Sequence, residues 1–391
     1  MSSLTREKLA QAVALVPRSG ADLWLTFVRE TSAAGDPALP LILDGGLTWQ
    51  SALMVSAAGE KVAVVGNYDA DPLIASGDWD RVVPYVQDIA PILRDELAKL
   101  LPSGGKIAVN MSESDVMADG LTHGMFVVLS KILDGLPYEL VSAERTVMAL
   151  RGIKSSEELA RIREALAETE RMFGDIASFA EIGVTERAVY SHVHTLAKER
   201  GLGFSWDPHG DPIVNSGPDS MIGHGIPSDS ITIQPGHIFH IDLGLTKNGY
   251  SSDIQRCWFV GDSVPEDVTH ALDSVKRAIR AGFALLKPGV QGWQVDAAAR
   301  ASLIADGYPE YMHALGHQVG RVAHDGGAIL GPRWERYGNT PMIPVEEGEV
   351  YTIELGITVP NRGYLGLEEM VVVRADGAEW LIPPQESMPL L

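Results

Sequence analysis

The sequence predicts an α+β protein with two domains: a smaller α/β domain over residues 1–150 and a larger domain over residues 151–391, built from two similar α+β halves. Three observations predict it. Apolar runs typical of strands alternate with helical spacing before residue 150. Two strand pairs that each carry two acids follow, both joined at an asparagine turn. The second part of the chain also repeats one order of elements twice.

Length, composition and charge bound the class of protein. A chain of 391 residues, 45% of them hydrophobic, is long enough for two domains and a large core. The formal net charge of −21 argues against nucleic acid or an anionic membrane surface as a partner. The N-terminal segment lacks the apolar core of a signal peptide, and no run approaches the ~20 apolar residues that span a bilayer. We therefore expect a cytoplasmic protein.

The single cysteine, Cys257, limits two kinds of chemistry. One cysteine excludes an intramolecular disulfide and a cysteine-based zinc site. It lies on an apolar strand between Arg256 and Trp258, where simple packing is the expected role. We do not expect it to act as a nucleophile.

The first 150 residues alternate strand and helix signals. The ranges 21–28, 61–65 and 106–109 predict strands, 5–16 predicts a helix, and apolar residues at helical spacing from Val86 to Leu101 predict another. Neither a GxGxxG turn nor a phosphate loop with GK[ST] occurs there, so nothing supports a nucleotide site.

The segment Arg151–Lys154 is the predicted domain boundary. After it, Ser155 and Glu158 have the spacing of a capping box, which predicts a helix running to about Ala180. A second helix is predicted between Thr185 and Gly201, and the same helix-turn-helix order returns at residues 265–287 and 292–305. Each helix pair is followed by a glycine-flanked histidine and by a strand pair with two acids, which indicates two similar halves facing a shared site.

The first strand pair turns at Asn248-Gly249, the strongest short hairpin signal because both residues tolerate the positive φ of a type I′ turn. This turn makes Lys247 face Tyr250 and puts Asp242 and Asp253 on one face of the hairpin. Two neighbouring carboxylates raise each other's pKa when buried, a conflict that a divalent cation removes. A solvated face carrying two unrelated acids is the alternative that the hairpin alone leaves open.

The second strand pair covers residues 349–358 and 367–373 and turns near residues 360–363. Centred on Asn361, it places Glu354 opposite Glu368. Two aspartates, two glutamates and a histidine suit Mn²⁺, Co²⁺, Fe²⁺ or Zn²⁺ better than Ca²⁺, which prefers oxygen alone. Four carboxylates exceed the needs of one ion and are about right for two.

Six segments together resemble one known family, the M24 metallopeptidases with the pita-bread fold, which include Xaa-Pro dipeptidases, aminopeptidase P and methionyl aminopeptidases. The segments are His224-Gly225-Ile226-Pro227, HIDLG at 240–244, YSSDIQR at 250–256, HALGHQVGRVAH at 313–324, YTIELGI at 351–357 and GLEEMVVV at 366–373. The resemblance covers residues 155–391 and implies two similar halves around a curved antiparallel sheet. Residues 1–150 resemble the creatinase-type N-terminal domain through position and size.

The resemblance implies a role for each site residue. The implied metal ligands are Asp242, Asp253, His317, Glu354 and Glu368. Asp253 and Glu368 would bridge two ions, and a hydroxide between the ions would attack the scissile carbonyl. Glu354 matches the residue that shuttles the proton. The expected substrate-binding histidines are His224, His313 and His324, of which His224 and His324 would also stabilise the tetrahedral intermediate. A loop or packing role is the alternative for each of these three.

Several residues depart from the family pattern. Gln318, Leu355, Gly366, Gln255 and the Asp325-Gly326-Gly327 stretch replace residues that are usual there. These changes leave the ligand set intact and alter the walls of the site, so they bear on the choice of substrate.

The resemblance implies a metallopeptidase that cleaves the bond between an N-terminal residue and proline in short peptides. It would carry two divalent metal ions, manganese first and cobalt, zinc or iron as alternatives, and would form a homodimer. Two other functions stay open: a hydrolase of a non-peptide amide or amidine C–N bond in a small molecule, and a non-catalytic binding module that retains the fold.

Overall fold

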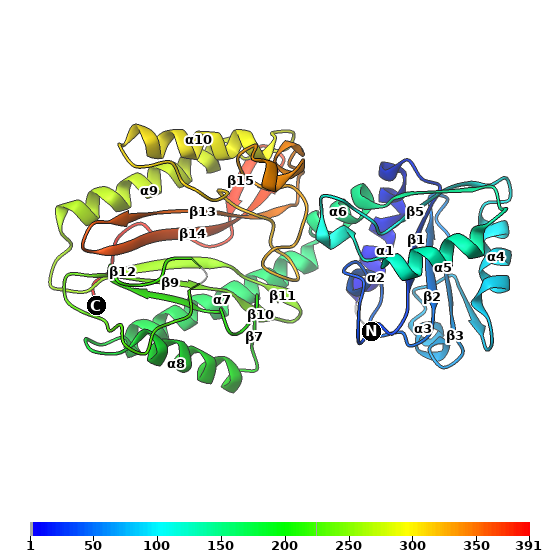
Figure 1. Cartoon of the computed structure of the whole chain (residues 1–391), viewed down its shortest axis with the longest axis horizontal. Coiled ribbons are helices and arrows are strands. Elements are labelled where there is room, and N and C mark those ends of the chain that lie inside the picture. Colours follow the sequence, from blue (N-terminus) through cyan, green and yellow to red (C-terminus); the bar gives the residue numbers. More distant parts are fainter. Residues whose placement is uncertain (1–2, 224) are drawn as a thin grey trace. The chain divides into compact units, whose positions relative to one another are not determined.

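The computed structural model describes residues 3–223 and 225–391 and divides the chain into two compact units, Met1–Arg151 and Gly152–Leu391 (Figure 1). The N-terminal unit contains one six-stranded sheet in the order β4-β3-β2-β1-β5-β6. Its strands are β1 (Leu23–Val28), β2 (Ser51–Ser56), β3 (Lys61–Gly66), β4 (Arg81–Tyr85), β5 (Gly105–Val109) and β6 (Tyr138–Ser142). Its helices are α1 (Ser3–Leu15), η1 (Val16–Ser19), α2 (Leu39–Ile42), α3 (Ala70–Ser76), α4 (Ile89–Leu100), η2 (Val116–Ala118), α5 (His123–Leu133) and α6 (Glu144–Gly152), the last of which ends at the boundary between the units.

The N-terminal sheet is mixed. β1 pairs antiparallel with β2 and parallel with β5, and β4 and β6 join the two edges in parallel. The predicted strands at 21–28, 61–65 and 106–109 correspond to β1, β3 and β5. β2, β4 and β6 were not predicted, and β4 and β6 are short edge strands, β4 with Pro84 inside it. Edge strands tolerate proline and polar residues, which weakens their sequence signal.

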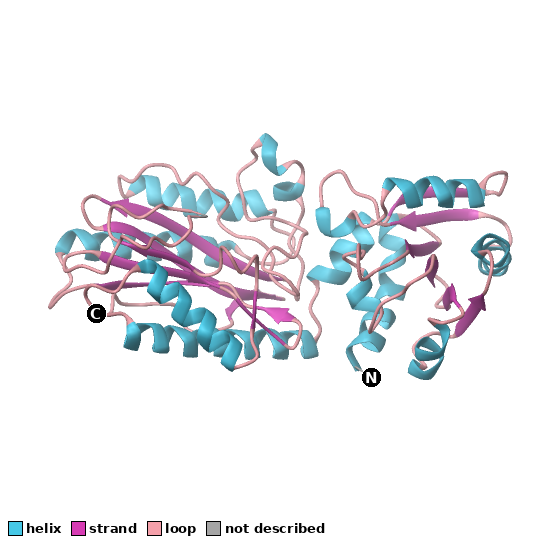
Figure 2. Ribbon diagram, turned by 60° about the horizontal axis from the view of Figure 1, so that its bottom comes forward, coloured by secondary structure: helices cyan, strands magenta, loops and turns pink. Residues whose placement is uncertain are grey.

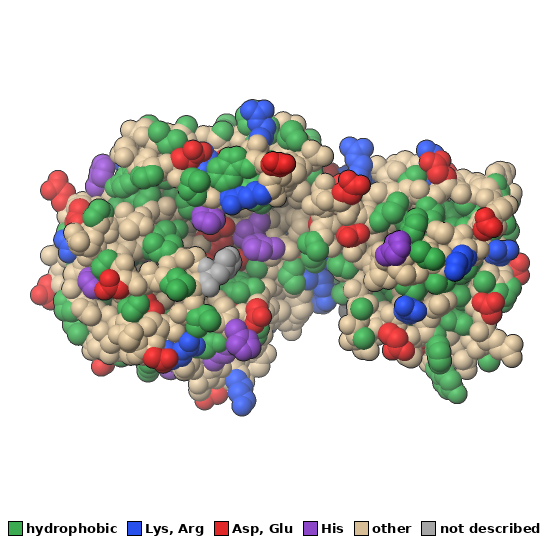
Figure 3. All heavy atoms as spheres, viewed as in Figure 1, with side chains coloured by type: hydrophobic (Ala, Val, Ile, Leu, Met, Phe, Trp, Pro, Cys, Tyr) green, Lys and Arg blue, Asp and Glu red, His purple; other side chains and the backbone are tan. Residues whose placement is uncertain are grey.

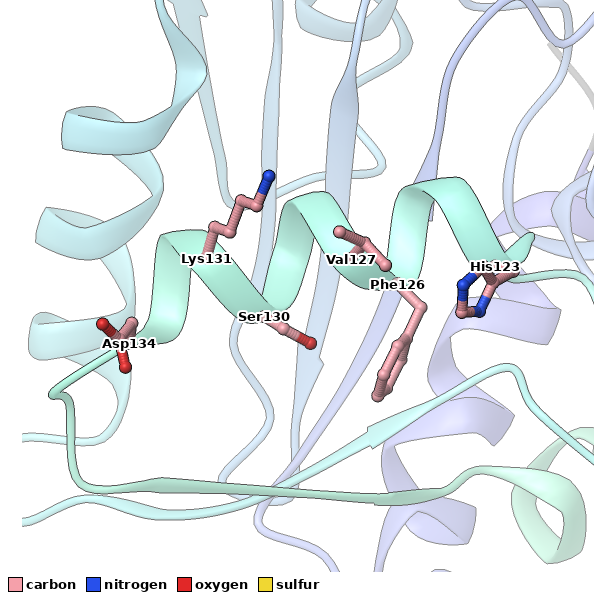
Figure 4. A pocket seen from close by; sticks show the side chains of 6 residues that line it. All are labelled: His123, Phe126, Val127, Ser130, Lys131 and Asp134. Carbon is pink, nitrogen blue, oxygen red and sulfur yellow. The ribbon is translucent and has the colours of Figure 1, made fainter.

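Helix α5 covers one side of this sheet and explains an apolar stretch. Residues Val116–Leu133 have the length and hydropathy of a membrane-spanning helix, and a third of this window is buried. The stretch is interrupted, because η2 ends at Ala118 and Thr122 caps a new helix. Leu129 and Ile132 pack in the core of the unit, as expected of a core helix. The opposite face of α5 lines a surface cavity of about 410 Å³ from His123 to Asp134 (Figure 4).

The C-terminal unit begins with the predicted capping box. Ser155 Oγ accepts the backbone N–H of Glu158, and Glu158 Oε2 accepts the backbone N–H of Ser155. This cap starts α7 (Ser156–Phe179), whose C-cap is Ala180 as predicted. The unit's other helices are α8 (Glu186–Glu199), α9 (Glu266–Leu285), α10 (Gly292–Ala305), η3 (Glu335–Tyr337) and η4 (Thr340–Met342).

A six-stranded antiparallel sheet forms the centre of the C-terminal unit. Its path is β13-β14-β12-β9-β8, with β15 paired to β14, and a smaller sheet has the order β11-β10-β7. The strands are β7 (Gly203–Phe204), β8 (Ile213–Ser216), β9 (Ile238–Leu243), β10 (Leu245–Lys247), β11 (Tyr250–Ser251), β12 (Ile254–Phe259), β13 (Val350–Val359), β14 (Gly363–Arg374) and β15 (Gly377–Trp380). In Figures 1 and 2 these strands lie between the α9–α10 pair and the α7–α8 pair.

The first hairpin has the predicted register. Lys247 pairs with Tyr250 across β10 and β11, and Asp242 pairs with Gln255 across β9 and β12. Asn248 and Gly249 have φ values of 51° and 76°, the positive values that a type I′ turn requires. The hairpin spans both sheets, since β10 and β11 belong to the smaller sheet, in which β10 pairs with both β11 and β7.

The second hairpin also has the predicted register, with Glu354 paired to Glu368 and the turn residue Asn361 at φ 61°. Alternate residues of β13, including Ile353 and Leu355, join the apolar core formed with α9 and α10. Because side chains alternate along a strand, Glu354 projects to the other face of the sheet. The core behind the sheet therefore fixes the side from which the acids emerge.

Cys257 lies on β12, is fully buried, and donates its Sγ hydrogen to the carbonyl oxygen of Gly366 at 3.1 Å. Burial raises the pKa of the Cys257 thiol to about 12. A thiol with this pKa stays protonated and unreactive near neutral pH, which agrees with the packing role predicted for it.

Candidate metal centre

Paired strands bring the acidic side chains together. Asp242 stands near the end of β9, and Asp253 immediately precedes β12, the strand paired with β9. Glu354 and Glu368 face each other directly on β13 and β14, and Gln255 links the two hairpins by pairing with Glu368. The order β13-β14-β12-β9 thus places both hairpins side by side in one sheet.

His317 reaches the acids from a segment that runs along β13. The backbone N–H of Thr352 donates to the carbonyl of His317, and the backbone N–H of Glu354 donates to the carbonyl of Leu315. Nε2 of His317 lies 3.7 Å from Asp253 Oδ2, 3.6 Å from Glu354 Oε1 and 3.8 Å from Glu368 Oε1. Ligand atoms of Asp253, His317 and Glu368 all lie within 4.8 Å of one another, so these three side chains could hold one metal ion.

The imidazole of His317 is held in the form that binds metals. Nδ1 lies 3.1 Å from the carbonyl oxygen of Ala323, to which an Nδ1–H donates. Burial, with a further contribution from His324, lowers the pKa of His317 to about 3. The ring is therefore neutral near pH 7, with an unprotonated Nε2 facing the acids. A carbonyl acceptor on the far nitrogen is the usual way in which proteins orient a metal-binding histidine.

The acids themselves are costly to ionise. Burial raises the pKa of Asp242 to about 7 and, with repulsion from Asp242, that of Glu354 to about 8. Burial and neighbouring carboxylates hold the pKa values of Asp253 and Glu368 well above their ordinary range. Within the described residues, neither lysine nor arginine forms an ion pair with any of these four side chains.

Two carboxylate oxygens of this cluster lack the hydrogen-bond partner that a buried oxygen normally has. Asp242 Oδ1 and Glu368 Oε1 are shielded from solvent and have no hydrogen-bond partner among the described residues. Shielded oxygens without a partner cost free energy unless they bind something. With four carboxylates and a neutral imidazole around them, the donor set fits divalent transition-metal ions.

The three predicted substrate-binding histidines are placed differently. His324 packs edge-on against His317, with ring centroids 4.2 Å apart. His313 is exposed and contacts the ring of Tyr311 at 5.5 Å. His224 lies outside the described residues. In Figure 3, histidine side chains surround a hollow on one face of the C-terminal unit, and acidic side chains are visible within it.

Several residues of the site carried no signal by themselves. Gln255 donates to two of the acids, and His240, which is buried, lies 3.0 Å from Gln255 Oε1 through its Nε2. Asp211 is a further buried acid whose pKa is raised well above its ordinary range by burial and by Asp242. Asp211 accepts backbone N–H groups of Ser205 and Gly244. Only long-range strand pairing brings these side chains to the site.

A comparison with protein families decides what this arrangement represents. Residues 160–375, more than half of the chain, match the model of metallopeptidase family M24. The chain belongs to family M24. The matched range contains every predicted metal ligand.

Relatives of this M24 protein include the Xaa-Pro dipeptidase of Pyrococcus furiosus, which is 33% identical over 256 residues that cover 64% of this chain and 68% of the relative. Among solved structures, the Xaa-Pro dipeptidase from Bacillus anthracis superimposes with a TM-score of 0.75 at 22% identity, covering 99% of this chain and 100% of that one. Dipeptidase PepE from Mycobacterium ulcerans superimposes with a TM-score of 0.74 at 26% identity, covering 99% of this chain and 98% of that one.

These similarities confirm two predictions for the M24 protein. The predicted fold, a pita-bread domain after a smaller α/β domain, is the fold of the superimposed structures. The predicted enzyme class, a metallopeptidase of the Xaa-Pro dipeptidase type, is also confirmed. A separate surface cavity of about 580 Å³ beside Met312 and Trp334 contains none of the predicted ligands.

Proposed function

We propose that this M24 metallopeptidase hydrolyses the bond between an N-terminal residue and proline in short peptides, using two divalent metal ions. The observation that carries the proposal is the convergence of four carboxylates, two of them buried, and a neutral imidazole, without a lysine or arginine partner among the described residues. The Xaa-Pro dipeptidase among its relatives supports proline as the residue after the cleaved bond.

The residues that would hold the ions are Asp242, Asp253, His317, Glu354 and Glu368. Manganese is the first candidate, and cobalt, zinc and iron suit the same donors. Divalent ions at such a site polarise a carbonyl and lower the pKa of water to near neutrality.

Glu354 is the proposed proton carrier. Its side chain is 20% exposed, against 6% for Asp253 and 2% for Glu368, so it is the more accessible of these acids. As a carboxylate, it can take a proton from water and return it to the departing amine nitrogen.

The histidines would hold the substrate. His324 is exposed beside His317, where an N–H can donate to the oxygen of the carbonyl under attack as negative charge develops there. We assign the same class of role to His224, and we assign substrate contact to His313. Replacing His324 by alanine should lower kcat by about 10²-fold, the usual cost of losing such a donor, with unchanged metal content.

The test is turnover of defined substrates by purified protein reconstituted with Mn²⁺, with metal content measured on the same sample. Xaa-Pro dipeptides and longer Xaa-Pro peptides should be cleaved before proline, and the same peptides with alanine in place of proline should be poor substrates. A protein that holds its metal and cleaves none of them would reject the proposed specificity.

A second candidate function has one specific observation behind it. The walls of the acid cluster carry uncharged groups at positions that depart from the family pattern, including Gln255 and Gly366. These departures favour testing small-molecule amides and cyclic amidines beside the peptides. Cleavage of such compounds in place of peptides would assign the non-peptide C–N hydrolase. Protein without bound metal or turnover would instead favour the non-catalytic binding module.

A further inference from the structure

Gln255 lies between the two glutamates of the site. Its Nε2 donates to Glu354 Oε2 at 3.1 Å and to Glu368 Oε2 at 3.1 Å. An amide NH₂ group has two hydrogens, so both are used on carboxylates. Gln255 is 6% exposed and Glu368 is 1% exposed, which keeps water from competing for the hydrogen bond between them.

The two hydrogen bonds select which oxygen of each glutamate faces the centre. With Oε2 of both held by the amide, the oxygens nearest to His317 Nε2 are the Oε1 atoms, at 3.6 Å for Glu354 and 3.8 Å for Glu368. Glu368 Oε1 is the shielded atom that lacks a hydrogen-bond partner. One side chain therefore orients two carboxylates toward the same point.

His240 keeps the amide of Gln255 in the required orientation. A glutamine amide turned by 180° would direct its oxygen at the two carboxylates and remove both hydrogen bonds. In the tautomer that carries its hydrogen on Nε2, His240 opposes this turn, because Nε2–H then donates to Gln255 Oε1 at 3.0 Å. Nδ1 of the same ring lies 3.1 Å from Asn215 Oδ1, and both residues are 3% exposed.

Gly366 leaves the space that this arrangement needs. A Cβ atom at position 366 would lie 2.6 Å from Gln255 Oε1 and 2.9 Å from His240 Nε2. Both distances are too short for unbonded atoms, so any side chain there would separate the imidazole from the amide. Three positions on different strands, β9, β12 and β14, are thus mutually dependent.

We propose that Gln255 is a positioning residue that orients Glu354 and Glu368 toward the metal, and that His240 and Gly366 keep its amide in place. The inference rests on the proposed metal centre but not on the proposed substrate. Residues behind the ligands that fix their orientation typically change metal affinity about 10- to 100-fold when they are replaced.

The test measures Mn²⁺ affinity of metal-free protein by titration calorimetry, without substrate. Gln255→Met keeps the length of the side chain and removes the amide, and should weaken Mn²⁺ binding about 10-fold or more. His240→Phe keeps a ring without N–H and should weaken it less. The double variant should equal Gln255→Met, because His240 acts through Gln255. The absorption bands of bound Co²⁺ should shift in all three.

A matched control is available in Gln318. Its sequence position predicted a place in the wall of the site, but in the structure its amide donates to Glu349 and Tyr351 and to none of the ligands. Like Gln255 it is a buried glutamine, 1% exposed. Gln318→Met should leave Mn²⁺ affinity within about twofold, because the Gln318 amide touches no ligand whose orientation it could change. Gly366→Ala removes no polar group and should weaken binding by separating His240 from Gln255. It provides a second route if Gln255→Met does not fold, as judged by thermal unfolding of the metal-free protein.

The outcomes separate this inference from the proposed function. Unchanged Mn²⁺ affinity in folded Gln255→Met, or in His240→Phe and Gly366→Ala if the first variant does not fold, would overturn it. The inference would also be overturned if Gln318→Met lost as much Mn²⁺ affinity as Gln255→Met, or if the losses of the two single variants added in the double variant. A wild-type protein that binds no metal would overturn it as well. Wild-type protein that binds Mn²⁺ but cleaves no Xaa-Pro peptide would remove only the proposed substrate.

Discussion

The clustered acids of the candidate metal centre lower the stability of the metal-free protein. Asp253 shows this most clearly, because burial and three other acids raise its pKa well above the ordinary range. A group in this state holds its proton when no cation is present. The neutral form of Asp253 is therefore the relevant one for the metal-free protein, and the ionised form is the relevant one for the metal-bound protein.

Replacing Asp253 by asparagine should separate these two states. Asparagine imitates the protonated carboxyl, so the metal-free variant should unfold at the temperature of metal-free wild type or slightly above it. Mn²⁺ at about 100 times its Kd should stabilise wild type by about 2.7 kcal/mol and the variant by much less. Thermal unfolding with and without Mn²⁺ measures both. An undiminished stabilisation by Mn²⁺ would show that Asp253 is not a ligand.

At the residue scale, part of the site could be predicted from the sequence. The five predicted ligand positions followed from two hairpins and a family resemblance, and the structure brings Asp253, Glu354 and Glu368 within 4 Å of the Nε2 atom of His317. Gln255 was visible only as a departure from the pattern. Its contacts depend on the pairing of β12 with β14, whose sequence positions are more than 100 residues apart. No local periodicity reports such a contact.

At the scale of elements, the two asparagine turns fix the registers that bring the acids together. The turn at Asn248-Gly249 determines which residues of β9 and β12 face each other, because a slip by one residue would reverse the face of every side chain. Gly249 has φ 76°, a conformation that costs a residue with a Cβ about 1–2 kcal/mol.

Replacing Gly249 by alanine should therefore lower the free energy of unfolding by about 1 kcal/mol. Denaturant unfolding of the metal-free protein measures the change. Gly174 supplies the control, since it is an exposed glycine within α7 with nothing within 4 Å of a Cβ position. Alanine there should stabilise the protein by about 0.5–1 kcal/mol. Equal effects at the two glycines would contradict the role assigned to the turn.

The three strands of the N-terminal sheet that were not predicted have weak sequence signals for two physical reasons. Strand β2 is buried on both faces and lacks the alternation that marks a half-buried strand. Strands β4 and β6 form the edges of their sheet and contain polar residues or proline. In contrast, helices α7 to α9 carry strong apolar periodicity, and the structure has these helices and α10 close to the predicted bounds.

At the scale of the whole molecule, the acid cluster should shape the pH dependence of stability. Folding raises the pKa of Asp242 from 3.8 to about 7 and that of Glu354 from 4.5 to about 8. Between pH 6.5 and 8.5 the folded metal-free protein therefore holds protons that the unfolded chain has lost, and its stability falls as pH rises. The lowered pKa values of His240 and His317, about 4 and 3, act only below pH 6.5, where they favour the unfolded chain.

Bound metal should oppose the loss of stability that the metal-free protein shows as pH rises. Bound cations favour ionised carboxylates, so metal binding releases protons and strengthens as pH rises. The rise in melting temperature on adding Mn²⁺ should accordingly be larger at pH 8.5 than at pH 6.5. Thermal unfolding in a chelator and in excess Mn²⁺ at both pH values measures this difference. Parallel curves would show that the acids are not the groups that bind the ion.

The buried cysteine of β12 offers a way to measure how often the strands of the candidate metal centre separate. Cys257 is the only thiol, and it donates to the carbonyl of Gly366, two residues before Glu368 on the neighbouring strand. A maleimide cannot reach it until β12 and β14 separate. These two strands carry Gln255 and Glu368, and Asp253 immediately precedes β12. The rate at which this sulfur is labelled, followed by mass spectrometry, should therefore report local opening of the sheet, and ion binding should slow that rate.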